Sequence, residues 1–139
     1  MNNISRKYDL KWTIDGHAPI GGSIRNPDWK QIRNKLDTLE ISKDGTVVLN
    51  LNNGKSDWKE LSVQGEGGYY FILFNDNIDD KTVFRRSFDS GAKIGKRSIG
   101  GYDWDARTTF QDYEFVCQVF EEYFRTGNVA SSRLYPRIP

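Results

Sequence analysis

The sequence of 139 residues contains only one cysteine and one histidine. An intrachain disulfide needs two thiols, and a structural zinc site normally takes four Cys or His ligands, so neither is expected to stabilise the fold. The lack of paired cysteines is typical of a reducing compartment. We therefore expect a cytoplasmic protein of bacterial type, without a bound metal or cofactor.

Long hydrophobic runs and an excess of one charge are also missing. No window approaches the roughly 20 apolar residues that span a bilayer, and the charged segment 1–7 is not followed by the apolar core of a signal peptide. Lys and Arg number 20 against 19 Asp and Glu, for a net charge of +1. This balance excludes a globally basic nucleic-acid binder and a globally acidic nucleic-acid mimic, so we expect no membrane partner and regard nucleic acid as unlikely.

Aromatic residues, in contrast, are plentiful: four Trp, seven Tyr and eight Phe. They supply enough apolar area to favour a folded core over intrinsic disorder. The length fits one domain, covering 1–139.

The periods of the apolar residues predict a single α+β domain with a mainly antiparallel β-sheet packed against two main helices. Alternating segments indicate strands, and the unbroken apolar run at 69–75 indicates a central strand covered on both faces. We expect strands at 7–14, 46–51, 58–64, 69–75 and 82–88, and helices at 27–40 and 110–126.

Capping residues predict where the two helices begin and end. Asn26 fits an N-cap followed by Pro27 as the first helical residue. Thr109 is expected to open the second helix, and Gly127 to end it in a left-handed conformation.

Glycine, proline and asparagine mark the expected connections. We expect loops at 15–26 and 90–107, the second with a short strand near 97–99. Residues 52–54 carry the Asn-Gly step of a tight hairpin turn, and the tail 128–139 is expected to be extended.

No set of residues forms a recognisable catalytic group. His17 has no orienting partner or nucleophile that the sequence places beside it, and Cys117 fits a small apolar filler on the last helix. The glycines at 65–68 lack the Lys-Ser/Thr pair of a phosphate-binding loop and indicate a connection between strands. We therefore expect that the protein is not an enzyme.

Two segments are candidates for binding a partner. The acidic turn at 76–80 lacks the spacing of a calcium loop, which leaves a solvated turn as the alternative. The segment 100–105 joins glycines to aromatic and acidic residues, as interface centres do, although its aromatics could equally be buried in the core. The candidate residues are Asp76, Asp79, Asp80, Tyr102, Asp103, Trp104 and Asp105.

The basic stretch at 85–97 supports a different function. Its cations, with Tyr102 and Trp104 nearby, are the ingredients of a nucleic-acid platform, and the alternative is a solvated face. The basic residues are Arg85, Arg86, Lys93, Lys96 and Arg97.

Three features together resemble the Imm1-like immunity proteins of bacterial polymorphic-toxin and contact-dependent growth inhibition systems. One is Pro27-Asp28-Trp29 opening a helix with an apolar stripe at Ile32, Leu36 and Leu39. The others are the strand-turn-strand segment 61–71 and the aromatic helix 110–126. The resemblance covers residues 24–135.

This resemblance implies a small cytosolic protein without enzymatic activity. It would bind the C-terminal domain of a cognate toxin, a nuclease, and block the toxin's active site or substrate access. The candidate residues at 76–80 and 102–105 would then form the toxin-binding surface, their carboxylates facing the basic site of a nuclease. A nucleic-acid-binding module that uses 85–97 is the alternative.

Overall fold

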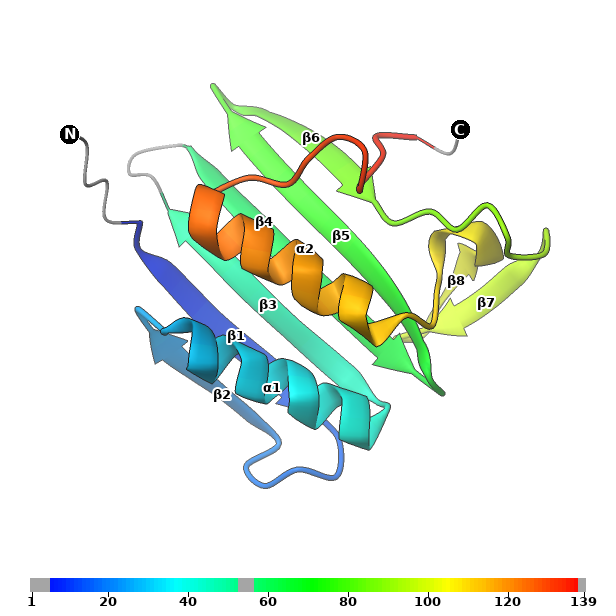
Figure 1. The fold of residues 1–139 in the computed structure, drawn as a ribbon, viewed down its shortest axis with the longest axis horizontal. Helices are drawn as coiled ribbons and strands as arrows, with labels where there is room; N and C mark the ends of the chain where they lie inside the picture. Colours follow the sequence, from blue (N-terminus) through cyan, green and yellow to red (C-terminus); the bar gives the residue numbers. More distant parts are fainter. Residues whose placement is uncertain (1–5, 53–56, 138–139) are drawn as a thin grey trace.

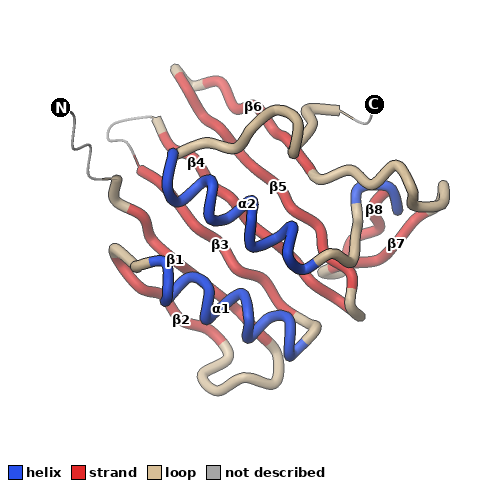
Figure 2. Tube along the Cα trace, in the orientation of Figure 1, coloured by secondary structure: helices blue, strands red, loops and turns tan. Residues whose placement is uncertain are grey.

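A computed structural model describes residues 6–52 and 57–137 of the protein. It confirms a single α+β domain, in which a six-stranded antiparallel sheet carries two helices on one face and a small hairpin at one end (Figures 1 and 2). The strands are β1 (Tyr8–Ile14), β2 (Gly21–Arg25), β3 (Gly45–Asn52), β4 (Trp58–Glu66), β5 (Tyr69–Ile78), β6 (Lys81–Arg86), β7 (Lys96–Ile99) and β8 (Tyr102–Asp105). The helices are α1 (Trp29–Ser42) and α2 (Tyr113–Thr126), and a 3-10 turn, η1, spans Ala106–Thr108.

The main sheet has the strand order β2-β1-β3-β4-β5-β6, and β7 pairs only with β8. The prediction that 69–75 forms an inner strand is confirmed, because β5 lies between β4 and β6. Its apolar run does not alternate because the start of the strand is covered on both faces. Ile72 and Phe74 belong to the core on the helix side, whereas Phe71 is buried on the other side under Trp104.

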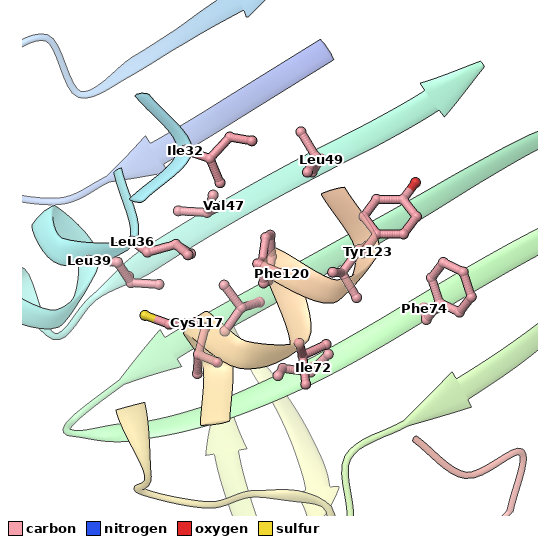
Figure 3. Close-up of a cluster of buried hydrophobic side chains, with 14 of the residues drawn as sticks. Ile32, Leu36, Leu39, Val47, Leu49, Ile72, Phe74, Cys117, Phe120 and Tyr123 are labelled. Atoms are coloured by element: carbon pink, nitrogen blue, oxygen red, sulfur yellow. The ribbon is translucent and has the colours of Figure 1, made fainter. Parts of the chain in front are cut away.

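The hydrophobic core fills the space between the helices and one face of the sheet (Figure 3). Each helix presents an apolar stripe at helical spacing, and the strands contribute every second residue, as their burial patterns show. Cys117 is part of this core, as expected of a small apolar filler. The fully buried helix residues are Ile32, Leu36, Leu39, Val116, Val119, Phe120 and Tyr123.

Tyr8 at the start of β1 ties the sheet to the end of α2. Its hydroxyl donates to the carbonyl oxygens of Tyr123 and Phe124 in the last turn of the helix, at 2.6 and 3.0 Å. The Tyr123 carbonyl also accepts from the Gly127 N–H that ends the helix. Burial raises the pKa of Tyr8 to about 12. The neutral phenol is therefore the form that the folded protein favours.

We expect part of the stability of the protein to be lost between about pH 10 and about pH 12. In the unfolded chain Tyr8 ionises near pH 10, whereas in the folded chain its pKa is about 12. This linkage contributes about 2 kcal/mol below pH 10. Urea unfolding across that range should show a shallower decline for Tyr8→Phe than for the wild type. Parallel declines would contradict this role of Tyr8.

Both helices begin later than predicted. Asn26 has a left-handed φ of +54°, which does not suit an N-cap, and Asp28 caps α1 instead. The Asp28 carboxylate accepts from the Gln31 N–H at 2.8 Å, and the Gln31 side chain accepts from the Asp28 N–H at 2.9 Å. Pro27 therefore lies outside the helix.

Asp112, not Thr109, caps α2, by accepting from the Phe115 N–H at 3.3 Å. Thr109 is buried at the end of η1, where its hydroxyl donates to Ala106. Gly127 ends the helix with φ +78°, as predicted.

Three of the predicted connections contain more structure than expected. Residues 15–26 include β2, an edge strand that pairs with β1, and 90–107 include the hairpin β7–β8. The tail is not simply extended, because it turns near residue 131 and Tyr135 then pairs with Arg86. The predicted turn at 52–54 falls partly outside the described residues, although β3 and β4 pair antiparallel beside it.

Candidate functional site

One face of the main sheet has no helix on it in the described parts of the chain, and we name it the open face. It consists of the alternate residues of the strands that point away from the core. Trp58 and Phe84 on this face keep 39 and 46% of their surface exposed. The other side chains near its centre, which are half-buried, are Val48, Asn50, Glu60, Ser62, Leu73 and Asn75.

The hairpin β7–β8 covers one end of the open face. The Trp104 ring stacks on Phe71 with centroids 4.2 Å apart and planes 17° apart, and its indole N–H donates to the Ile99 carbonyl at 3.1 Å. The Gly100 N–H adds a bond to the Glu66 carboxylate at 3.0 Å. Trp104 therefore fastens the hairpin to the sheet.

The predicted segment 100–105 is thus the turn of a hairpin followed by the strand β8, rather than a loop that conforms to a partner. Of its aromatics, Trp104 is half-buried, whereas Tyr102 is 67% exposed at the hairpin tip. Asp103 is exposed. Tyr102 and Asp103 remain accessible for a partner.

Asp105 is engaged within the chain. Its carboxylate accepts from the Arg107 side chain at 2.8 and 3.0 Å and from the Arg107 N–H at 3.0 Å. These hydrogen bonds lower the pKa of Asp105 to about 2. The carboxylate is therefore ionised and neutralised by its own neighbour, which makes it a weak contact for a basic partner.

The acidic residues at 76–80 do not all belong to a turn. Asp76 lies within β5, on the helix side of the sheet, 4.0 Å from the Lys59 ammonium. Asp79 and Asp80 are the two turn residues between β5 and β6, with φ of +52° and +62°. Asp is one of the residues that tolerate such a turn, so the geometry of the hairpin accounts for both.

The structure does not bring the two predicted binding segments together. Phe71, under the hairpin, and Asp79, in the turn, are eight residues apart along β5, or about 25 Å at strand spacing. Figure 1 shows the hairpin β7–β8 and the β5–β6 turn at opposite ends of the sheet. The expected single surface is therefore two separate regions.

A pocket of about 230 Å³, which we name the notch, lies on the open face between the hairpin and β6. Its lining residues are Phe71, Leu73, Phe84, Arg86, Trp104, Asp105 and Thr108. Of these residues, only Trp104 and Asp105 were predicted from the sequence to belong to a protein-binding surface. The period-two spacing of Phe84 and Arg86 was the available signal, since it places both on one side of β6.

The basic stretch does not form one surface either. Arg85 and Arg86 are consecutive in β6 and point to opposite faces. Arg85 donates to the Val129 carbonyl at 2.8 Å and to the Asn128 side chain at 3.0 Å, and its burial lowers its pKa. Arg97 lies 3.5 Å from the centre of the Tyr69 ring.

A larger pocket, of about 710 Å³, lies between β7 and the start of α2. Lys93 and Arg97 line it, but so do Asp89 and Asp112. Both carboxylates accept backbone hydrogen bonds, Asp89 from Gly91 at 2.9 Å and Asp112 as the cap of α2. The pocket therefore presents charges of both signs, and its acidic residues serve the local fold.

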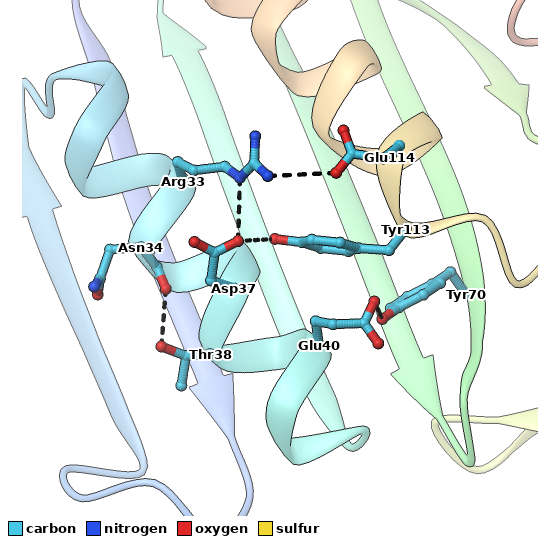
Figure 4. Close-up of polar contacts among 8 residues, drawn as sticks. All are labelled: Arg33, Asn34, Asp37, Thr38, Glu40, Tyr70, Tyr113 and Glu114. Carbon is cyan, nitrogen blue, oxygen red and sulfur yellow. Dashed lines mark hydrogen bonds and ion pairs between the residues drawn. The ribbon is translucent and has the colours of Figure 1, made fainter.

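A polar cluster joins α1 to α2 (Figure 4). Tyr113 donates to Asp37, which also accepts from the Arg33 Nε at 3.1 Å, and Arg33 reaches Glu114 at 3.5 Å. Burial and the bond to Asp37 raise the pKa of Tyr113, and burial raises the pKa of Cys117. Both groups are therefore protonated near neutral pH, so the cluster supports helix packing and lacks an activated nucleophile.

Beside this cluster, Tyr70 donates to Glu40 at 2.7 Å (Figure 4), and the Tyr70 ring lies 6.2 Å from the Tyr113 ring. The side chain of His17 is half-buried and makes no hydrogen bond within the described residues. Over that same part of the chain, no group of three His, Cys, Asp or Glu side chains is arranged to hold a metal ion. None of its helices is both long and apolar enough to cross a membrane.

Comparison with known proteins identifies a family but no activity. A search of curated proteins finds no match. The crystal structure of a hypothetical protein from Neisseria gonorrhoeae has a similar fold, with a TM-score of 0.65 and 14% identity over 94% of this chain and 95% of that one. The sequence profile of the family of unknown function DUF6911 matches residues 11–133. The chain therefore belongs to the DUF6911 family.

Proposed function

We propose that the protein is an immunity protein, which binds the toxin domain of a bacterial nuclease and blocks its active site or substrate access. The observation that carries this proposal is the open face, a sheet surface with exposed aromatic side chains that the described chain covers only at one end, by the hairpin β7–β8. Aromatic residues are enriched in protein interfaces, where polar groups accompany them. The resemblance to Imm1-like proteins gives the kind of partner.

The chemistry of the open face suits binding to a protein. Trp58 and Phe84 offer aromatic area, the residue class that contributes most to interface energies. Asn50, Ser62 and Asn75 together provide hydrogen-bonding groups on the same face of the sheet. Because the side chains stand on paired strands, little conformational entropy would be lost when a partner binds.

The arrangement of the basic residues favours a protein partner over nucleic acid. A nucleic-acid platform needs cations and aromatics on one continuous surface. Arg85 instead stabilises the C-terminal segment on the helix side, and Arg97 covers Tyr69. Nucleic acid nevertheless remains a distinct outcome of the binding test.

The test uses the toxin domain encoded by the gene immediately upstream, since an immunity gene should follow its toxin gene. Co-expression of the protein should rescue growth of cells that produce this domain, and calorimetry should show tight binding. Absence of a toxin gene there, failure to rescue, or binding to DNA or RNA instead of the toxin domain would contradict the proposal.

Phe84→Ala is expected to weaken toxin binding by about 2 kcal/mol, or about 30-fold, because Phe84 would be buried in the complex. Val83→Ala is the matched control. Val83 is similarly exposed, at 53%, but points to the opposite face of β6. Equal effects of the two substitutions in calorimetric titrations would show that the open face is not the interface.

A further inference from the structure

The notch has the size of a site for a single side chain. Its volume of about 230 Å³ lies below the roughly 300–1,000 Å³ of pockets for small-molecule ligands. A cavity of about 150 Å³ already holds a benzene molecule. Phe71, Leu73, Phe84 and Trp104 give it apolar walls, so it can accept one aromatic or leucine-sized group.

Arg86 places a positive charge without an ion-pair partner among the described residues at this apolar site. Its Nε–H is buried and has no hydrogen-bond partner, and the guanidinium forms no ion pair with the described residues. A carboxylate can pair with a guanidinium through two parallel hydrogen bonds. Asp105 also lines the notch, but Arg107 already occupies its carboxylate.

We propose that the notch binds a segment of a partner protein in which an apolar side chain stands beside a carboxylate. The apolar side chain fills the space between Phe84 and Trp104, and the carboxylate pairs with Arg86. This inference rests on the proposed function and names the chemistry by which the partner is recognised. A free carboxyl terminus after a large apolar residue offers the same two groups.

The probe is 3-phenylpropionate, which joins one aromatic ring to one carboxylate, and its comparison compound is the neutral 3-phenylpropanamide. Titration into ¹⁵N-labelled protein should shift the indole N–H signal of Trp104, with a Kd of about 1–10 mM for so small a ligand. The amide should bind at least about fivefold more weakly, because it cannot form the charged pair.

Three variants locate the two halves of the site. Arg86→Gln should lower the affinity for the acid at least about fivefold and leave the affinity for the amide unchanged. A variant that failed to fold would lose affinity for both compounds. Phe84→Ala should weaken both compounds. Lys11→Gln, which removes an exposed cation from the same face on β1, should change neither.

Equal binding of acid and amide to the wild type, or no shift of the Trp104 signal, would overturn the inference. Arg86→Gln should also be titrated with the toxin domain. Unchanged toxin affinity would remove the notch from the interface and leave the proposed function standing. Selective binding of the probe by a protein that binds no toxin would support the notch and reject the proposed function.

Discussion

Replacement of Phe120 by alanine is expected to lower the free energy of unfolding by about 3–5 kcal/mol, the range typical of a buried Phe. Phe120 is fully buried on the face of α2 that packs on the sheet (Figure 3). Truncation removes the transfer energy of the ring and leaves a cavity that the surrounding strands cannot fill, because they are fixed by their hydrogen bonds. Denaturant unfolding measures the loss.

Gln118→Ala provides the matched control on the same helix. Gln118 is exposed and two residues away, so its truncation should change the free energy of unfolding by less than about 0.5 kcal/mol. A loss below about 1 kcal/mol for Phe120→Ala would show that the core rearranges around the missing ring.

The elements that the sequence predicted well are those with a strong apolar period. The stripe of α2 and the alternation of β1 follow directly from burial on one side. The strand β2 was missed because its glycines are typical of a loop. The strand β2 forms because it can pair with the free edge of β1. The residues of β2 alone do not show that this edge is available.

The helix starts show a different limit. Asn26 and Asp28 are both good capping residues, and Gln31 decides between them by completing the reciprocal pair with Asp28. The same reasoning explains the second helix, where Asp112 competes with Thr109. The side chain of Thr109 instead bonds to the preceding turn, which the sequence could not show.

The candidate site was harder to predict than the fold because it depends on topology. From their charge and aromatic character, Asp79 and Trp104 were predicted to share one binding surface. In the structure, their segments lie at opposite ends of strand β5 (Figure 1). The stack of Trp104 on Phe71 joins residues 33 positions apart in the sequence and turns a predicted contact residue into a support for the hairpin. The notch arises only from this packing.

The fold keeps two of the residues proposed to bind, Trp58 and Phe84, apart from the hydrophobic core. The core lies on the helix side of the sheet, and Trp58 and Phe84 lie on the other. Changes at these two exposed residues should therefore alter binding with little effect on unfolding, as surface substitutions usually do. A loss of affinity on substitution of Trp58 or Phe84 can therefore be assigned to the interface and not to unfolding.

Gly45→Ala is expected to destabilise the protein by at least about 3 kcal/mol, although the substitution adds only one carbon atom. Gly45 opens β3 with φ +152° and pairs with Ile14 of β1. A Cβ atom there would lie 2.5 Å from the Thr13 carbonyl oxygen and 2.8 Å from the Ile14 Cα. Both are backbone atoms of a paired strand, so the clash can be relieved only by moving β1 away from β3.

The matched control is Gly67→Ala in the turn between β4 and β5. Gly67 also has a positive φ, of +61°, but no atom lies within 4 Å of the position that its Cβ would take. The substitution should cost only the strain of the left-handed conformation, about 1–2 kcal/mol. Urea unfolding should therefore rank Gly45→Ala well below Gly67→Ala in stability. Equal losses would mean that β1 and β3 can separate at this end without weakening the sheet.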